Sequence, residues 1–148
     1  HEIDYLNFLF GDIIKIYSVK KKVSNLCISG EDICALIIKH KNDVISELHL
    51  DYLRPIKKRG CEIVGENGTL IWESEGKNPE KCVVKFCDRE SNQYKELLVN
   101  NNIDTNYCYE ILAKEFITSI ENSSNDNLLM AKDAIKQLKI IENCIILD

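Results

Sequence analysis

The stretch DICALIIKHKNDVISELHLDYL, residues 32–53, decides the fold. Its first half places Cys34, Leu36 and Ile38 on one face of a strand, and the residues between them, also apolar, on the other. Lys41-Asn42 then interrupts the run, and a second alternating run follows. Two such runs joined by a short polar turn predict a β-hairpin. Apolar side chains on both faces predict that both sides of the sheet are covered.

Further strands and three helices are predicted on either side of this hairpin. GCEIVG and GTLIWE flank Glu66-Asn67-Gly68, which predicts a second hairpin with an Asn-Gly turn. The other predicted strands have β-branched or aromatic runs: 13–19, 81–88 and 93–99. The predicted helices have apolar residues at helical spacing: 1–10, which Gly11 ends, 109–120, and 128–142 after a polar break at 123–127.

This order of elements predicts an α+β fold. We expect a largely antiparallel sheet of about six strands, with helices packed on one face and the other face available for dimerisation. A chain of 148 residues is long enough for a single domain with its own core, so we expect one domain over residues 1–148.

Composition and charge exclude several classes of function. The net charge of −5 argues against a nucleic-acid or anionic-membrane binder. No apolar run approaches the roughly 18–20 residues that cross a bilayer, and the N-terminus has no signal-peptide pattern. The seven cysteines are odd in number and include no C-x-x-C pair, so we interpret them as reduced thiols. These features predict a soluble, cytoplasmic protein.

Several catalytic and cofactor motifs are missing from the sequence. It contains no G-x-G-x-x-G, no G-x-x-x-x-G-K-[ST], no H-E-x-x-H and no G-x-S-x-G. No spacing of cysteine and histidine suits zinc. We therefore expect neither a bound dinucleotide nor a metal in this chain, which by itself lacks the parts of a complete enzyme.

The strongest local signal is the pair His1 and Asp4 in HEIDYLNFLFGD. Side chains at i and i+3 of a helix meet on one face, so the carboxylate could orient the imidazole or share a substrate hydroxyl with it. An oriented imidazole can give or take a proton near neutral pH. The same spacing also occurs in solvated pairs without a function, and spacing alone leaves both readings open.

Four segments in order extend this signal. HEIDYLNFLFGD resembles the H-x-x-D helix of the Gfo/Idh/MocA family, the group of glucose-fructose oxidoreductase and inositol dehydrogenase. SGEDICALIIKHKNDVISELHLDYLRP resembles the family's E-D-x-A hairpin, and RGCEIVGENGTLIWE its R-x-x-x-I-x-G-x-x-G-x-L hairpin. LLMAKDAIKQLKIIENC resembles its closing helix. The resemblance covers essentially the whole chain.

The resemblance implies a site. The family's helix histidine, here His1, acts in proton transfer or substrate positioning, and the aspartate, here Asp4, lines the same pocket. Tyr52 and Arg54 are further candidates for substrate binding. Tyr52 could instead continue a core face, and Arg54 could cap a strand end. The basic run from Arg54 to Arg59 could bind an anionic substrate group or simply be a solvated connection.

The resemblance also implies a missing half. Family members carry an N-terminal Rossmann domain with the dinucleotide site and an E-K-P motif, and neither is present here. The chain resembles the C-terminal substrate-binding and oligomerisation domain of an NAD- or NADP-dependent enzyme acting on a sugar, cyclitol or nucleotide-sugar hydroxyl. The isolated chain is expected to be inactive. The alternative is a non-catalytic α+β interaction module that dimerises through its sheet.

Overall fold

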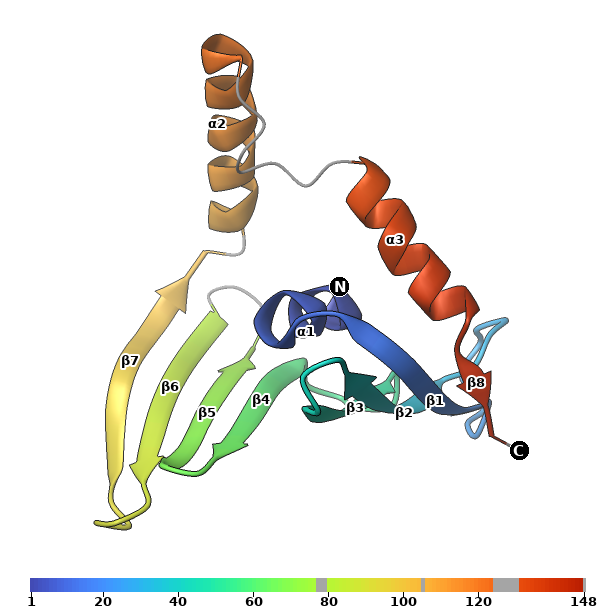
Figure 1. Ribbon diagram of the computed structural model, residues 1–148, viewed down its shortest axis with the longest axis horizontal. Coiled ribbons are helices and arrows are strands. Elements are labelled where there is room, and N and C mark those ends of the chain that lie inside the picture. Colours follow the sequence, from blue (N-terminus) through green and yellow to red (C-terminus); the bar gives the residue numbers. More distant parts are fainter. Residues whose placement is uncertain (77–79, 105, 124–130, 148) are drawn as a thin grey trace. The chain divides into compact units, whose positions relative to one another are not determined.

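The computed structural model describes residues 1–76, 80–104, 106–123 and 131–147, which fall into two compact units. The first unit combines residues 1–53 with the described part of 129–148, and the second covers the described part of 54–128. Figure 1 labels the elements, which follow one another as α1 (Glu2–Phe10), β1 (Ile13–Lys21), β2 (Ile33–His40), β3 (Ile45–Asp51), β4 (Lys58–Gly65), β5 (Gly68–Glu75), β6 (Glu80–Asp88), β7 (Tyr94–Ile103), α2 (Tyr107–Asn122), α3 (Ala131–Glu142) and β8 (Ile145–Ile146).

The first unit contains a four-stranded sheet in the order β3-β2-β1-β8. The predicted hairpin is confirmed: β2 and β3 pair antiparallel with Leu36 opposite Leu48. Asp43 takes a positive φ of 64° in the turn between them. The two-residue strand β8 pairs parallel with β1, after α3 has returned the chain to this sheet.

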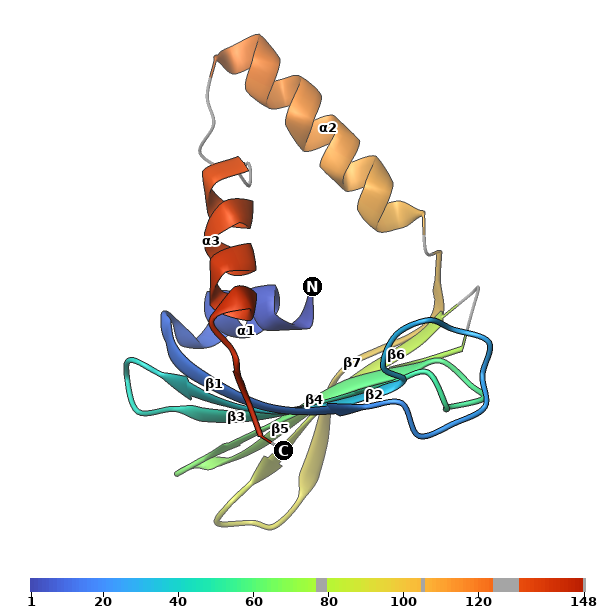
Figure 2. The ribbon, with the colours of Figure 1, turned by 90° about the vertical axis from the view of Figure 1, so that its right-hand side faces the viewer.

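A small apolar core holds α1 against one face of this sheet. Leu6 of α1, Ile16 of β1, and Leu36 and Ile38 of β2 are buried together. Figures 1 and 2 both show α1 on one side of these strands. Ile140 of α3 packs against the same cluster. Gly11 ends α1 with a φ of 79°, as the sequence predicts, because glycine adopts this conformation without steric cost.

His40 is a fully buried polar residue that ties α1 to the hairpin. Its Nδ1 lies 2.9 Å from the carbonyl oxygen of Gly11, and its Nε2 lies 3.0 Å from the hydroxyl of Ser46. The ring also meets Phe10 edge-on, with the ring centroids 5.7 Å apart. Both ring nitrogens are therefore satisfied, which removes the cost of burying them. This histidine is structural.

The second unit contains a four-stranded antiparallel sheet in the order β4-β5-β6-β7. The second predicted hairpin is confirmed, with Gly65 opposite Gly68 and Glu66-Asn67 between them. Trp72 of β5 donates its indole N–H to the Cys82 sulfur at 3.1 Å, and the Arg59 guanidinium lies 5.9 Å from its ring centroid. Trp72 is thus part of the sheet packing, as a half-buried tryptophan with a partner for its N–H.

The α+β class and the largely antiparallel pairing agree with the prediction. The strands differ in number and grouping: the described residues form eight strands in two sheets, where the sequence predicted about six in one. β8 has only two residues, too few for any periodic signal. The predicted start of the final helix at Leu128, and residues 124–127 of the polar break, lie outside the described residues.

Candidate functional site

The two predicted site residues on α1 occupy its N-terminus. His1 is the N-cap residue, and its carbonyl oxygen accepts a hydrogen bond from the Tyr5 N–H at 3.1 Å. Its side chain is exposed and does not cap the helix. Asp4 is half-buried in the first turn. In the described part of the chain no hydrogen bond joins these two side chains, so the predicted orientation of the imidazole by Asp4 is not formed here.

An open groove of about 750 Å³ lies beside the same end of α1, within the first unit. α1 contributes Glu2 to it, the loop before β2 contributes one wall, and the end of β3 contributes the other. The described lining residues are Glu2, Ile28, Ser29, Gly30, Glu31, Asp32, Ile33, Cys34, Leu50, Asp51 and Tyr52. Of the four predicted site residues, Tyr52 lines this groove, and His1 is the chain neighbour of Glu2.

Asp32 fixes the loop that forms one wall. Its carboxylate accepts hydrogen bonds from the Val23 N–H at 2.7 Å and the Ser24 N–H at 2.8 Å, and also from the Ser24 hydroxyl. The Lys22 ammonium lies 3.7 Å away. The hydrogen bond from the Ser24 hydroxyl, followed by the others, lowers the pKa of Asp32 from 3.8 to about 2. The hydrogen bonds of the Asp32 carboxylate therefore stabilise the loop at the groove's wall, and we assign Asp32 a structural role.

Asp51 positions Tyr52 at the opposite wall. The Asp51 carboxylate accepts a hydrogen bond from the Leu53 N–H at 3.0 Å, and His49 Nε2 lies 3.1 Å from its other oxygen. The Tyr52 N–H donates to the Asp32 carbonyl oxygen at 3.0 Å. The backbone is thus held on both sides of Tyr52, whose side chain is 72% exposed at the rim. Tyr52 does not continue the core face, which was the structural alternative.

The chemistry of the groove is that of a hydroxyl-binding surface. Carboxylates line it from three elements and accept hydrogen bonds, and the Tyr52 phenol can donate or accept one. No lysine, arginine or histidine is among its described lining residues. Basic groups just outside the lining contact these carboxylates: the Lys20 ammonium lies 3.9 Å from Glu31 and the Lys22 ammonium 3.7 Å from Asp32.

The sequence prediction assigned no role to the four acidic lining residues. Glu2, Glu31, Asp32 and Asp51 come from α1, the loop before β2 and the end of β3, which only the fold brings together. Glu2 is next to His1, and Asp51 ends a strand immediately before Tyr52, so adjacency to the predicted residues was the available signal. Polar residues at strand ends and in the loops beside them are disproportionately functional.

Arg54 lies at the start of the second unit, in the basic run that could bind an anion. Much of that run is already engaged. Lys57 pairs with Glu80, and Lys58 Nζ lies 2.9 Å from Glu73 Oε1. The Lys58 ammonium lowers the pKa of Glu73, and the Lys57 ammonium that of Glu80. These contacts favour a structural role, rather than anion binding, for Lys57 and Lys58.

The described residues offer neither a metal site nor a membrane-spanning helix. Within the described residues, no group of three or more histidine, cysteine, aspartate or glutamate side chains could hold a metal ion. The seven cysteines are free thiols. No helix in the described ranges is both long and apolar enough to cross a membrane.

A protein-family comparison matches nearly the whole chain. The model described as the oxidoreductase family, C-terminal alpha/beta domain (GFO_IDH_MocA_C), matches residues 1–146. No curated protein matches the sequence.

Solved structures share the fold at low sequence identity. A protein from Desulfitobacterium hafniense proposed to be an NADPH-dependent oxidoreductase superposes with a TM-score of 0.76 at 11% identity, covering 97% of this chain and 42% of that one. The 3-ketoreductase KijD10 of Actinomadura kijaniata, in complex with TDP-benzene and NADP, gives 0.67 at 10%, covering 99% and 46%. Biliverdin reductase of Synechocystis, with biliverdin and NADP+, gives 0.66 at 12%, covering 96% and 43%. The chain therefore spans less than half of each.

Proposed function

Because this chain belongs to the Gfo/Idh/MocA oxidoreductase family as its C-terminal α/β domain, we propose that it forms the substrate-binding part of an NAD- or NADP-dependent oxidoreductase. The observation that carries the proposal is the family match over residues 1–146. Two of the similar structures contain NADP or NADP+, which supports a nicotinamide cofactor for the whole protein.

The dinucleotide itself does not fit the described residues of this chain. A pyrophosphate binds at a helix N-terminus that follows a glycine-rich turn. α1 carries Glu2 and Asp4 in its first turn, and α2 carries Glu110, so negative charge at these helix N-termini disfavours a phosphate there. We therefore assign the dinucleotide to another part of the protein and assign substrate contacts to this chain.

The proposed substrate is a sugar, cyclitol or nucleotide sugar, which reacts at a hydroxyl-bearing carbon. His1 is the proposed proton-handling residue, and Asp4 the proposed hydroxyl-binding carboxylate beside it on α1. Tyr52 is proposed to bind the substrate from the groove rim, where its phenol is exposed. Arg54 is the fourth proposed substrate contact. Carboxylates in the groove support a hydroxyl-rich ligand because they accept hydrogen bonds from hydroxyl groups.

The uncovered face of the first sheet is proposed to be a dimer surface. Opposite the face that α1 covers, β2 exposes Ile37 by 52% and β3 exposes Ile45 by 67%, with Val19 of β1 on the same side. The same face also carries Lys39 and Glu47, so it is apolar only in part, and exposed aliphatic side chains of this kind are commonly buried in an assembly. A second copy of the same sheet would supply matching apolar side chains.

The function is tested by assaying the full-length protein with a panel of sugars and cyclitols in the presence of NAD and NADP. We expect nicotinamide reduction with at least one neutral polyol, whose hydroxyl groups can donate hydrogen bonds to the groove's carboxylates. Absence of dinucleotide binding in the full-length protein would contradict the oxidoreductase proposal and favour the alternative, a non-catalytic interaction module.

A further inference from the structure

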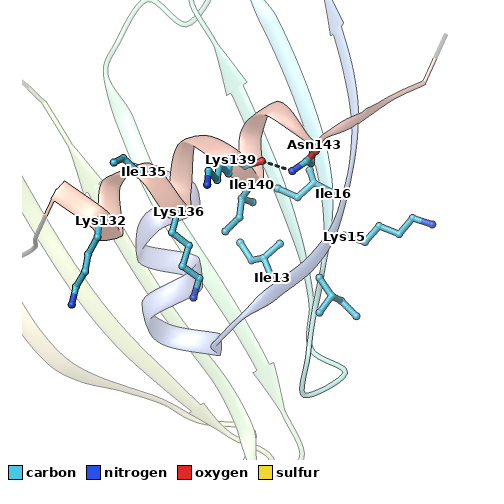
Figure 3. Close-up of a pocket in the computed structure, with 10 residues that line it drawn as sticks. Ile13, Lys15, Ile16, Lys132, Ile135, Lys136, Lys139, Ile140 and Asn143 are labelled. Atoms are coloured by element: carbon cyan, nitrogen blue, oxygen red, sulfur yellow. Dashed lines mark hydrogen bonds between the residues drawn. The ribbon is translucent and has the colours of Figure 1, made fainter.

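A second groove lies between α3 and β1, apart from the residues of the proposed substrate site. It has a volume of about 390 Å³ and belongs entirely to the first unit. Figure 3 shows α3 on one side of it and the beginning of β1 on the other. This volume is near the lower end of the roughly 300–1,000 Å³ of small-molecule sites, so it suits a small ligand rather than a folded partner.

The floor of this groove is aliphatic. Every apolar residue lining it is an isoleucine: Ile13, Ile14, Ile16, Ile135 and Ile140. Ile16 is part of the buried core, and Ile13 and Ile140 pack against it, so the floor is a fixed surface. No aromatic ring is among the described lining residues, so a planar base or ring finds no stacking partner. A flexible hydrocarbon chain is the ligand part that such a floor fits.

The helix side of the groove is cationic. Lys132, Lys136 and Lys139 recur at i, i+4 and i+7, which places them along one side of α3. Lys136 already holds a carboxylate, since its ammonium donates to Asp12 Oδ1 at 2.7 Å. Lys132 and Lys139 form no ion pair with any residue that the structure describes. No carboxylate lines the groove among the described residues.

The remaining polar groups do not alter this polarity. Lys15 turns away from the groove in Figure 3, and its ammonium lies 4.9 Å from the ring centroid of Tyr17. The Asn143 side-chain amide donates to the Lys139 carbonyl oxygen at 2.9 Å, a contact that is internal to α3 and its end. The groove therefore offers an aliphatic floor with positive charge along one edge.

We propose that this groove binds an aliphatic carboxylate, with its acyl chain on the isoleucines and its carboxylate at the lysine edge, paired with Lys132 or Lys139. A carboxylate already pairs with the same row of lysines at Asp12, so the ligand's head group reproduces a contact that the structure contains. The proposal is independent of the oxidoreductase function, because none of its residues belongs to the substrate groove.

The probe is decanoate, titrated into the full-length protein with labelled isoleucine methyl groups below the concentration at which decanoate forms micelles. We expect methyl signals of Ile13, Ile16 and Ile140 to shift, while Ile63 and Ile71 of the second unit stay in place. Decanol, which has the chain without the charge, should bind about fivefold more weakly, and acetate should not shift these methyls. Equal affinity for decanoate and decanol would overturn the role of the lysines.

Substitutions locate the head group. The variant Lys132→Gln/Lys139→Gln should weaken decanoate binding about fivefold or more and leave decanol binding unchanged. Lys114→Gln on α2 is the matched control and should bind decanoate as the unaltered protein does. If decanoate shifts methyls elsewhere, or if the double variant binds it as tightly as the control, the groove is not an acyl-carboxylate site.

Discussion

At the scale of single residues, Asp32 shows how one carboxylate can build a site without entering its chemistry. Its carboxylate accepts hydrogen bonds from the Val23 and Ser24 N–H groups and from the Ser24 hydroxyl, and these bonds fix the loop that forms one wall of the groove beside α1. A carboxylate that accepts several such bonds is stabilised in its charged form. The local structure therefore depends on Asp32 being ionised.

The pH dependence of this loop follows from the lowered pKa. Because the pKa of Asp32 falls from 3.8 unfolded to about 2 folded, its contribution is fully present above about pH 4 and is lost as the pH falls toward 2. The amide proton shifts of Val23 and Ser24 should titrate with a midpoint near 2, and Asp32→Asn should abolish that titration. A midpoint of 3.8 would show that the loop does not hold the carboxylate.

Some of these residues could be predicted from the sequence, and others could not. His1, Asp4 and Tyr52 stand out by residue type or family resemblance, and the structure places Tyr52 at a groove and His1 beside Glu2, which lines it. His40 carries no such signal. Asp32 belongs to the segment that resembles the E-D-x-A hairpin, but its role, like that of His40, depends on partners at loop ends and helix ends that only the fold brings near. The sequence around a single histidine in a strand does not show whether its side chain is buried or exposed.

At the scale of elements, local turn chemistry was predictable and strand partnership was only partly so. Both hairpins follow from alternating runs around short polar turns, and the structure has both. The division into two sheets and the parallel pairing of β8 with β1 join residues far apart in sequence, which no local pattern encodes. α2 matches its predicted helical period, yet none of its described residues is buried.

Gly68 is the element-scale position most sensitive to substitution. It begins β5 with a φ of 154°, and an added Cβ would lie 2.2 Å from the Cys87 carbonyl oxygen. Gly68→Ala should therefore lower the free energy of unfolding of the second unit by at least about 2 kcal/mol. Urea unfolding followed by Trp72 fluorescence measures it. Gly65→Ala on the same hairpin is the control and should change little, because an added Cβ there would meet only the Gly68 carbonyl oxygen, at an ordinary contact distance of 3.6 Å. Similar losses in both variants would refute the steric argument.

At the scale of the whole molecule, the exposed face of the first sheet bears on assembly. Ile37→Glu should convert a dimer of the full-length protein to monomers at concentrations where the unaltered protein is dimeric, because residue 37 lies opposite Glu47 on β3 and the interface would then bury two adjacent carboxylates. Val64→Glu, an exposed position on the second sheet, is the control. Analytical ultracentrifugation distinguishes the outcomes, and an unaltered protein that stays monomeric would reject this surface.

We propose that this chain binds the substrate and that another part of the protein binds the dinucleotide. The most direct measurement compares His1→Ala with the unaltered full-length enzyme, recording kcat and the dissociation constant of the dinucleotide. We predict a fall in kcat of about 100-fold or more, typical of a lost acid–base residue, with dinucleotide affinity unchanged. Equal losses in turnover and in dinucleotide affinity, or no loss in either, would contradict the assignment of His1 and of its helix to the substrate side.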